Sequence, residues 1–316
     1  MHALSLVIAL LLIFFVLFDA FETIILPRRI RRRIRITTMT YRVTWLPWAA
    51  LAHSMRRNPA RRESFLGFYG PLALIFLLFV WAVGLVVGFA LIQWGLGSHL
   101  VDASTSRAGF GSDLYMSGTT FFTLGLGDVA PRTGPERFAT VVESGVGFAF
   151  LALVISYLPI LYQAFSRREV NVALLDARAG SPPSGVELVR RLGTEDGAQM
   201  LVRILAEWEH WSSELLESHL SYPSLGYFRS QHENQSWIAA LTTILDACAL
   251  VMTGLEGVPK QQARLTFAMA RHAAVDLSQV FEAETKRERR REWLSDEEFE
   301  HLRARAVSAS SCSHRV

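Results

Sequence analysis

The sequence predicts an all-α membrane protein with three transmembrane helices, a short helix that enters the membrane between the second and third, and a cytoplasmic helical domain. Two apolar stretches carry this prediction: residues 67–101 contain no Asp, Glu, Lys or Arg, and residues 138–166 contain a single one, Glu143. A helix of about 20 apolar residues suffices to span a bilayer. A wholly soluble protein is therefore excluded, and Cys248 and Cys312 give neither zinc-ligand spacing nor a disulfide framework.

The three expected spans cover residues 3–26, 66–94 and 136–165. The first ends before Pro27 and is followed by a run of arginines. A cleaved signal peptide would carry its positive charge before the apolar core, so the reverse order predicts a retained helix. Asp19 and Glu22, near the end of this helix, are expected to pair with nearby arginines.

Charge asymmetry predicts how these spans are oriented. The net charge of +3 combines an arginine-rich half, residues 1–168, with an acidic half, residues 169–316. The positive-inside rule places the arginines between Arg28 and Arg62, together with Arg167 and Arg168, in the cytoplasm. The expected location is the cell membrane, multi-pass, with the N-terminus outside, residues 95–135 facing outward and the C-terminal half cytoplasmic.

Aromatic and basic residues alternate between the first two spans. Tyr41, Trp45, Trp48 and Leu51 stand among the arginines of residues 36–64, a composition typical of an interfacial helix. Membrane lipids, anionic ones included, are the partner expected along Arg28–Arg62.

Residues 111–131 are too short and polar for a further span, yet too apolar for a simple loop. Ser112 can cap a helix over residues 112–122, with Asp113 in its first turn; its length would be about 16 Å, half a bilayer. Irregular backbone at membrane depth is tolerated where it lines a water-filled path or is buried in protein. Gly125 and Gly127 permit dihedral angles that could point successive carbonyls toward one axis.

The run Thr123-Leu-Gly-Leu-Gly-Asp128 resembles the selectivity filter of the tetrameric potassium channels, usually Thr-Val-Gly-Tyr-Gly-Asp. Its central leucine is similar to variants in some two-pore-domain potassium channels. The resemblance covers residues 66–165 as outer helix, pore helix, filter and inner helix, and one filter strand per chain implies a homotetramer. It implies that permeant K⁺ is bound by Thr123, Leu124, Gly125, Leu126, Gly127 and Asp128. The alternative is a tight buried turn at Gly-Leu-Gly.

Three departures from the family pattern predict an unusual support for this segment. Phe122 stands where a second threonine is usual, Leu126 replaces a bracing tyrosine, and Thr119 occupies the place of a glutamate found in some members. Apolar packing of Phe121, Phe122 and Leu126 is therefore expected to hold the filter.

Glu143 is the single charge inside the third span, and intramembrane acids are functional candidates by default. We expect it to support the filter from behind. The alternative is a protonated or water-exposed carboxyl near the membrane surface.

The third span also carries candidates for a gate. Gly145 and Gly147 could form a hinge, since glycine weakens a helix, or could allow close packing against the pore helix. Pro159 should kink the cytoplasmic end. A cavity-lining face that could gate by dewetting is predicted at Phe148, Leu151 or Ala152, Ile155 and Pro159.

Beyond a break at residues 181–185, the pattern is helical. An apolar stripe is predicted at Met200, Ile204, Trp208, Trp211 and Leu215, followed by a turn at residues 222–226. Residues 237–255 could form a fourth span, but this would export the basic run Lys286–Arg291, so a buried bundle helix is preferred. Helices over residues 259–281 and beyond complete the expected domains, which are 1–35, 36–65, 66–166 and 167–316.

No catalytic, cofactor or nucleic-acid signature is found in the C-terminal half. His210, His219, His232 and His272 lack metal-ligand spacing, and there is no glycine-rich phosphate loop. The expected protein is a non-enzymatic channel that conducts K⁺ passively, with no cofactor and an unidentified gating ligand. The alternatives are a nonselective or sodium-passing cation channel, and a membrane-anchored regulatory protein with a vestigial pore.

Overall fold

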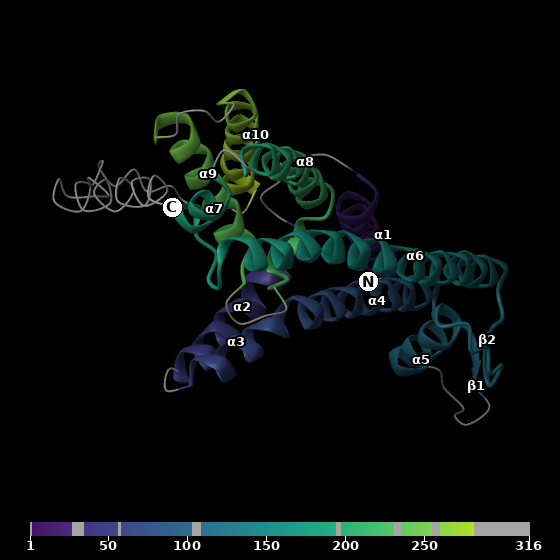
Figure 1. The fold of residues 1–316 in the computed structure, drawn as a ribbon. Helices are drawn as coiled ribbons and strands as arrows, with labels where there is room; N and C mark the ends of the chain where they lie inside the picture. Colours follow the sequence, from purple (N-terminus) through teal and green to yellow (C-terminus); the bar gives the residue numbers. More distant parts are fainter. Residues whose placement is uncertain are drawn as a thin grey trace, which may run out of the picture. The chain divides into compact units, whose positions relative to one another are not determined.

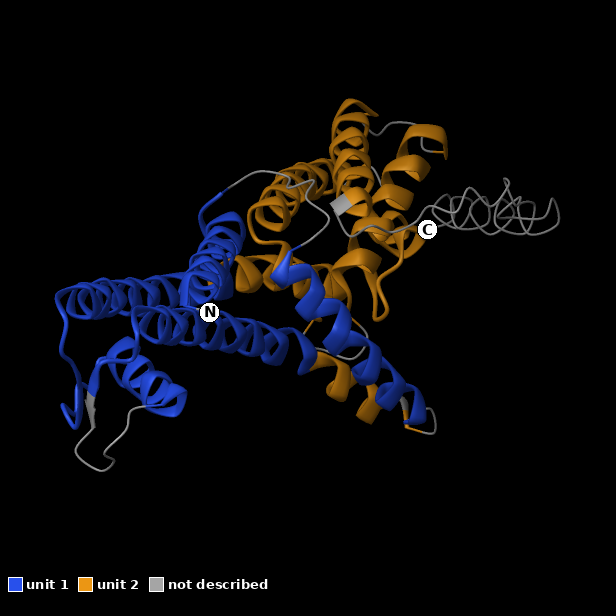
Figure 2. Cartoon of the chain, turned by 180° about the vertical axis from the view of Figure 1, so that it is seen from behind, with its two compact units in different colours: residues 1–56, 68–162 blue, residues 57–67, 163–316 orange. Residues whose placement is uncertain are grey.

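Long helices dominate the computed structural model of the chain (Figure 1), which describes residues 2–26, 35–55, 58–102, 109–193, 197–230, 235–254 and 260–280. They form two compact units, residues 1–56 with 68–162 and residues 57–67 with 163–316 (Figure 2). Within these described ranges, four helical segments are long and apolar enough to cross a membrane: His2–Ile25, Ala60–Leu96, Gly134–Ala179 and Trp237–Gly254. The first three correspond to the expected spans.

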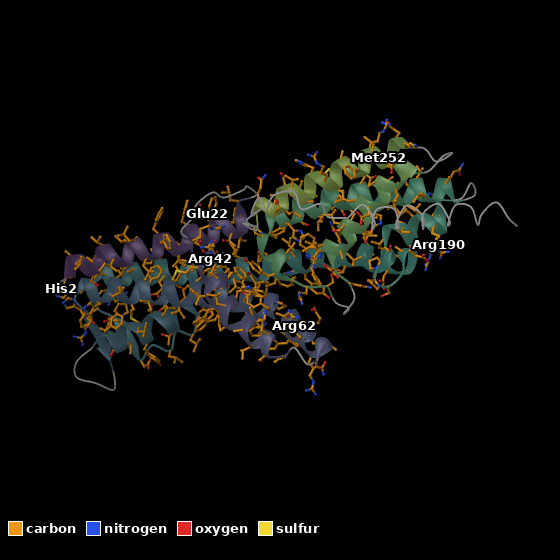
Figure 3. The ribbon with its side chains drawn as sticks, turned by 90° about the vertical axis from the view of Figure 1, so that its left-hand side faces the viewer. His2, Glu22, Arg42, Arg62, Arg190 and Met252 are labelled. Carbon is orange, nitrogen blue, oxygen red and sulfur yellow. The ribbon has the colours of Figure 1, made fainter. Side chains whose placement is uncertain are left out.

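In the first unit, helix α1 (His2–Ala20) continues into a π-helical turn, η1 (Phe21–Ile25), and packs along α4 (Tyr69–Leu96). Three glycines of α4 face α1: Gly84 lies against Val16, Gly88 against Ile13 and Gly95 against Leu6. Small residues let membrane helices approach closely, which explains the length of this contact. Figure 3 shows His2 and Glu22 toward opposite ends of this α1–η1 segment.

A buried polar cluster lies where α1 continues into η1. Asp19 Oδ2 accepts hydrogen bonds from Trp81 Nε1 of α4 (3.0 Å) and from the backbone N–H (3.0 Å) and hydroxyl (2.7 Å) of Thr37. Arg35 Nε lies 3.7 Å from Asp19 Oδ1 and 3.7 Å from Glu22 Oε2. The predicted pairing of these acids with an arginine is thus confirmed, and a low-dielectric site makes such pairing necessary.

The segment expected to form one interfacial helix is divided into α2 (Ile36–Ser54) and α3 (Pro59–Gly67). Asn58 Oδ1 accepts the backbone N–H of Arg61 (3.2 Å), so a side-chain cap and a proline at the first helical position start a new helix. Helix α2 belongs to the first unit and α3 to the second. In the second unit, Arg229 donates a hydrogen bond to Glu63 of α3.

Two short strands and two helices complete the first unit. β1 (Leu100–Asp102) pairs antiparallel with β2 (Val129–Pro131), with Val101 opposite Ala130. Helix α5 (Phe110–Phe121) lies between these strands in the sequence and packs on α4. Helix α6 (Gly134–Ala179) follows β2 and runs without interruption through Pro159.

The second unit is a helical bundle of the end of α6 with α7 (Gly185–Leu192), α8 (Ala198–Ser221), a 3-10 turn η2 (Pro223–Tyr227), α9 (Trp237–Gly254) and α10 (Lys260–Val280). Ile204, Trp208, Trp211 and Leu215 of α8 are buried in its core as predicted, but Met200 is 46% exposed. The stripe instead continues through Leu201, because spacings of three and four fit a helical face equally well.

Candidate ion-conduction site

Helix α5 begins two residues before the expected start. Gly109, in extended conformation (φ −128°, ψ 174°), occupies the N-cap position, and Ser112 lies inside the first turn. The expectation that Ser112 caps this helix is therefore wrong; glycine serves because the cap position needs non-helical backbone. Asp113 lies in the first turn as predicted, buried, and accepts a hydrogen bond from Ser98 Oγ (2.6 Å).

The backbone after α5 alternates in handedness. Thr123, Gly125 and Gly127 have φ of 59°, 57° and 78°, whereas Leu124 and Leu126 are outside the left-handed region. In a regular strand, successive carbonyls point in opposite directions; reversing the handedness at every second residue brings them to the same side. Residues 123–128 are all exposed in the single chain. The segment can therefore present several carbonyl oxygens along one line.

Carbonyls at the end of α5 hold this strained segment. A β-branched residue at positive φ costs about 1–3 kcal/mol and persists only when its surroundings enforce it. Thr120 O accepts the N–H of Thr123 (3.0 Å), and Thr119 O accepts those of Leu124 (2.8 Å) and Gly125 (3.2 Å). Thr119 thus contacts this segment through its backbone, while its hydroxyl donates to Met116 O (3.0 Å).

Tyr115 of α5 contacts the C-terminal end of this segment, a contact that was not predicted from the sequence. Tyr115 Oη donates a hydrogen bond to Asp128 Oδ2 (2.9 Å). The expected apolar support is present in part: Phe121 is fully buried and its ring lies 5.6 Å from that of Phe150, but Phe122 and Leu126 are 48% and 61% exposed. The hydrogen bond to Asp128 had one signal in the sequence, which was the presence of a tyrosine, Tyr115, within the expected short helix.

Residues just outside the segment form a second buried network. Glu136, in the first turn of α6, accepts the backbone N–H groups of His99 (2.9 Å) and Thr133 (3.1 Å). Gln93 of α4 donates to Thr140 Oγ1 (3.1 Å) and to Glu136 O (3.2 Å). With the β1–β2 pairing, this network connects the chain on both sides of α5 to the C-terminal end of α4 and the N-terminal end of α6.

The two glycines of α6 differ in their surroundings. A Cβ atom on Gly147 would overlap the carbonyl oxygen of Phe121 and lie 2.9 Å from its carbonyl carbon; on Gly145 it would meet nothing within 4 Å. Gly147 is thus the residue at which α6 packs closely against α5. The predicted cavity-lining side chains Phe148, Ile155 and Pro159 are exposed in the single chain, and Glu143 is buried against Ser117 of α5.

Comparison with known proteins identifies this region. Residues 74–164 match the family described as "Ion channel". This segment is therefore similar to ion-channel proteins. It contains α5, residues 123–128 and the glycines of α6, as the resemblance in the sequence predicted. The match begins within α4 and ends within α6.

A match to one curated relative is longer than the match to this family. The chain is 24% identical over 191 residues to the "Uncharacterized membrane protein YdjJ" of Bacillus subtilis (strain 168), a match that covers 60% of this chain and 55% of the relative. The match thus spans about half the length of that relative. No solved structure matches the chain. The protein is a multi-pass membrane protein in which residues 74–164 are similar to ion channels.

Several sequence-based candidates lie elsewhere. Among the described histidines, His219 is buried, and His210 and His272 are exposed with acidic neighbours one turn away. No group of three or more metal-ligating side chains occurs within the described ranges. Outside those ranges lie His232, Cys312, the basic run 286–291 and its expected charged helix, and the arginines of residues 27–34 and 56–57.

Proposed function

We propose that the chain assembles as a homotetramer that conducts K⁺ selectively and passively across the cell membrane. The observation that carries this proposal is the alternating handedness of residues 123–127, in a Thr-Leu-Gly-Leu-Gly-Asp run that directly follows a half-membrane helix in an ion-channel domain. Four such strands around one axis would stack rings of carbonyl oxygens, which can replace the hydration shell of a cation. No cofactor is required, because the conducted ion is the substrate.

Exposed apolar side chains favour assembly of several copies. Phe138, Val141, Phe148 and Ile155 of α6 are 69–72% exposed in the single chain. In a tetramer, those that do not contact lipid would face partner subunits or the cavity. The exposed stripe through Ile155 and Pro159 fits a hydrophobic gate, and Gly145 retains the space that a hinge requires.

The proposed orientation, with the N-terminus outside and the C-terminal half cytoplasmic, follows from the distribution of arginines by the positive-inside rule. Helix α9 fits this assignment as a bundle helix, because Ala240, Ile244 and Ala247 along it are fully buried within the second unit. A span in contact with lipid would instead present apolar side chains outward. We therefore assign three membrane crossings, although α9 is long and apolar enough for a fourth.

Lipids are the proposed partner of the basic region, and α2 supports this. Met39, Val43 and Leu46 of α2 are 67%, 59% and 71% exposed, and Arg42 stands among them. An exposed apolar face with a basic residue beside it suits the boundary between acyl chains and anionic headgroups. Neither a nucleic acid nor an enzymatic substrate is proposed as a partner.

Reconstitution of the purified full-length protein in liposomes tests the function. K⁺ flux and a reversal potential that follows the K⁺ gradient are expected. Gly125→Ala, at φ 57°, should abolish flux but leave assembly intact, because a Cβ disfavours that backbone. Flux with no discrimination between K⁺ and Na⁺ would support a nonselective channel. Absence of flux in a folded tetramer would support a regulatory protein with a vestigial pore.

A further inference from the structure

Three helices of the first unit meet at one serine of the pore helix. Ser117 Oγ lies 2.7 Å from the carbonyl oxygen of Val86 on α4 and within hydrogen-bond distance of Glu143 Oε1 on α6. Ser117 and Glu143 are both fully buried. The other carboxyl oxygen, Glu143 Oε2, is buried and has no hydrogen-bond partner among the described residues.

Counting protons decides which group donates. A serine hydroxyl has a single proton and accepts with its lone pairs, whereas a backbone carbonyl can only accept. Both contacts are hydrogen bonds at the same time only if Ser117 donates its proton to Val86 O and the carboxyl of Glu143 donates a proton of its own to Ser117 Oγ. An ionised Glu143 would leave two acceptors competing for one proton.

The surroundings of Glu143 lead to the same conclusion. Helix α4 contains no Asp, Glu, Lys, Arg or His. The charged groups of the other two helices nearby are Asp113 on α5, one turn before Ser117, and Glu136 with the exposed Arg137 on α6, almost two turns before Glu143. The buried groups nearest along the helices are thus acids, which disfavour a further negative charge. A buried carboxylate without a cation is costly, so such a group is held neutral.

We propose that Glu143 is a neutral, protonated carboxylic acid that positions the pore helix by donating a hydrogen bond to Ser117. Glu143 and Gly147 are four residues apart on α6, and their contacts Ser117 and Phe121 are four apart on α5. The two helices therefore touch at two successive turns. Phe121 is two residues before Thr123, so this double contact sets where the filter begins. The inference rests on the proposed channel function for its consequence, but its protonation state can be measured separately.

Infrared spectroscopy of the full-length tetramer in liposomes at neutral pH tests the proposal. The difference spectrum between wild type and Glu143→Gln should show the loss of a protonated-carboxyl C=O band. Glu187→Gln is the matched control: the Arg190 and Arg191 side chains lower the pKa of Glu187 to about 2, so its difference spectrum should show the loss of carboxylate bands alone. Ser117→Ala removes the hydrogen-bond acceptor and should shift the Glu143 band in a protein that retains its carboxyl.

Conduction provides the second readout. Glu143→Gln keeps a donor and should retain flux, whereas Glu143→Ala should lower flux by about fivefold or more, the effect of one lost buried hydrogen bond. A carboxylate band lost in Glu143→Gln, or a Glu143 band unmoved by Ser117→Ala, would overturn the proposal. A protonated band in a tetramer without flux would leave the protonation state established and refute the channel function instead.

Discussion

Substituting Gly147 with alanine tests how the inner helix contacts the pore helix. The added Cβ would overlap Phe121 O and lie 2.9 Å and 3.0 Å from the carbonyl carbon and Cα of Phe121. Ordinary contacts of this kind begin near 3.4 Å, and the obstructing atoms are backbone, which cannot rotate away. The overlap with the Phe121 oxygen therefore requires one helix to shift by about one ångström.

The expected cost follows from two opposing effects. Overpacking a close contact destabilises by about 1–3 kcal/mol, while replacing a helical glycine with alanine recovers about 1 kcal/mol. Gly145→Ala is the matched control, because its Cβ meets nothing within 4 Å and the recovery alone remains. The shift in Gly147→Ala also reaches the filter, since Phe121 O is two residues before Thr123.

Liposome flux and the thermal stability of the detergent-solubilised tetramer measure both consequences. We expect Gly147→Ala to lower K⁺ flux by at least tenfold and to reduce the melting temperature, while Gly145→Ala retains flux and slightly raises the melting temperature. Equal flux in the two variants would refute the close-packing role of Gly147. Selective loss of flux in Gly145→Ala would instead identify Gly145 as a hinge or subunit contact.

Three further outcomes are expected. Tyr115→Phe removes the hydrogen bond to Asp128 and should reduce the conducting fraction of channels about fivefold, which corresponds to about 1 kcal/mol for one exposed hydrogen bond. Adding Asp128→Asn to Tyr115→Phe should reduce this fraction little further. Fully additive losses would show that the two residues act separately. Burial, together with the positive charge of Arg168, lowers the pKa of His219 to about 3. The fold is therefore most stable above the unfolded-state pKa of about 6.5, where His219 is neutral in both states, and it loses stability as the pH falls. Thermal unfolding should show a loss of about 3 kcal/mol at pH 4.5, with a weaker pH dependence in His219→Gln. A third test introduces single cysteines after Cys248 and Cys312 have been replaced. A cysteine in place of the exposed Arg132 should react with a membrane-impermeant reagent from outside, and a cysteine in place of Ser184 should react only from inside. External labelling at position 184 would support a fourth span or an inverted topology.

Tertiary contacts determine which ring nitrogen of His219 carries the proton. Its Nδ1 lies 2.8 Å from Leu215 O, which only accepts, and its Nε2 lies 3.3 Å from Arg168 Nη1, which only donates. The proton is therefore on Nδ1. In the sequence, His219 could not be distinguished from the exposed His210 and His272.

Local pattern was sufficient for the main elements of this protein. The long apolar stretches predicted the helices α1, α4 and α6, because helix length and hydrophobicity depend on the segment itself. The positive φ angles of Gly125 and Gly127 were foreseeable, since glycine adopts them without a steric penalty. The match of residues 74–164 to the ion-channel family agrees with the motif that these glycines form.

Contacts between distant segments were decided by the tertiary structure alone. Gly145 and Gly147 are chemically identical and two residues apart, yet only Gly147 faces the Phe121 backbone. The hydrogen bond from Tyr115 to Asp128 and the contact between Ser117 and Glu143 likewise depend on how α5 packs against its neighbours. Sequence periodicity indicates which side of a helix is buried, but the partner on that side is chosen by helix packing, which no local pattern encodes.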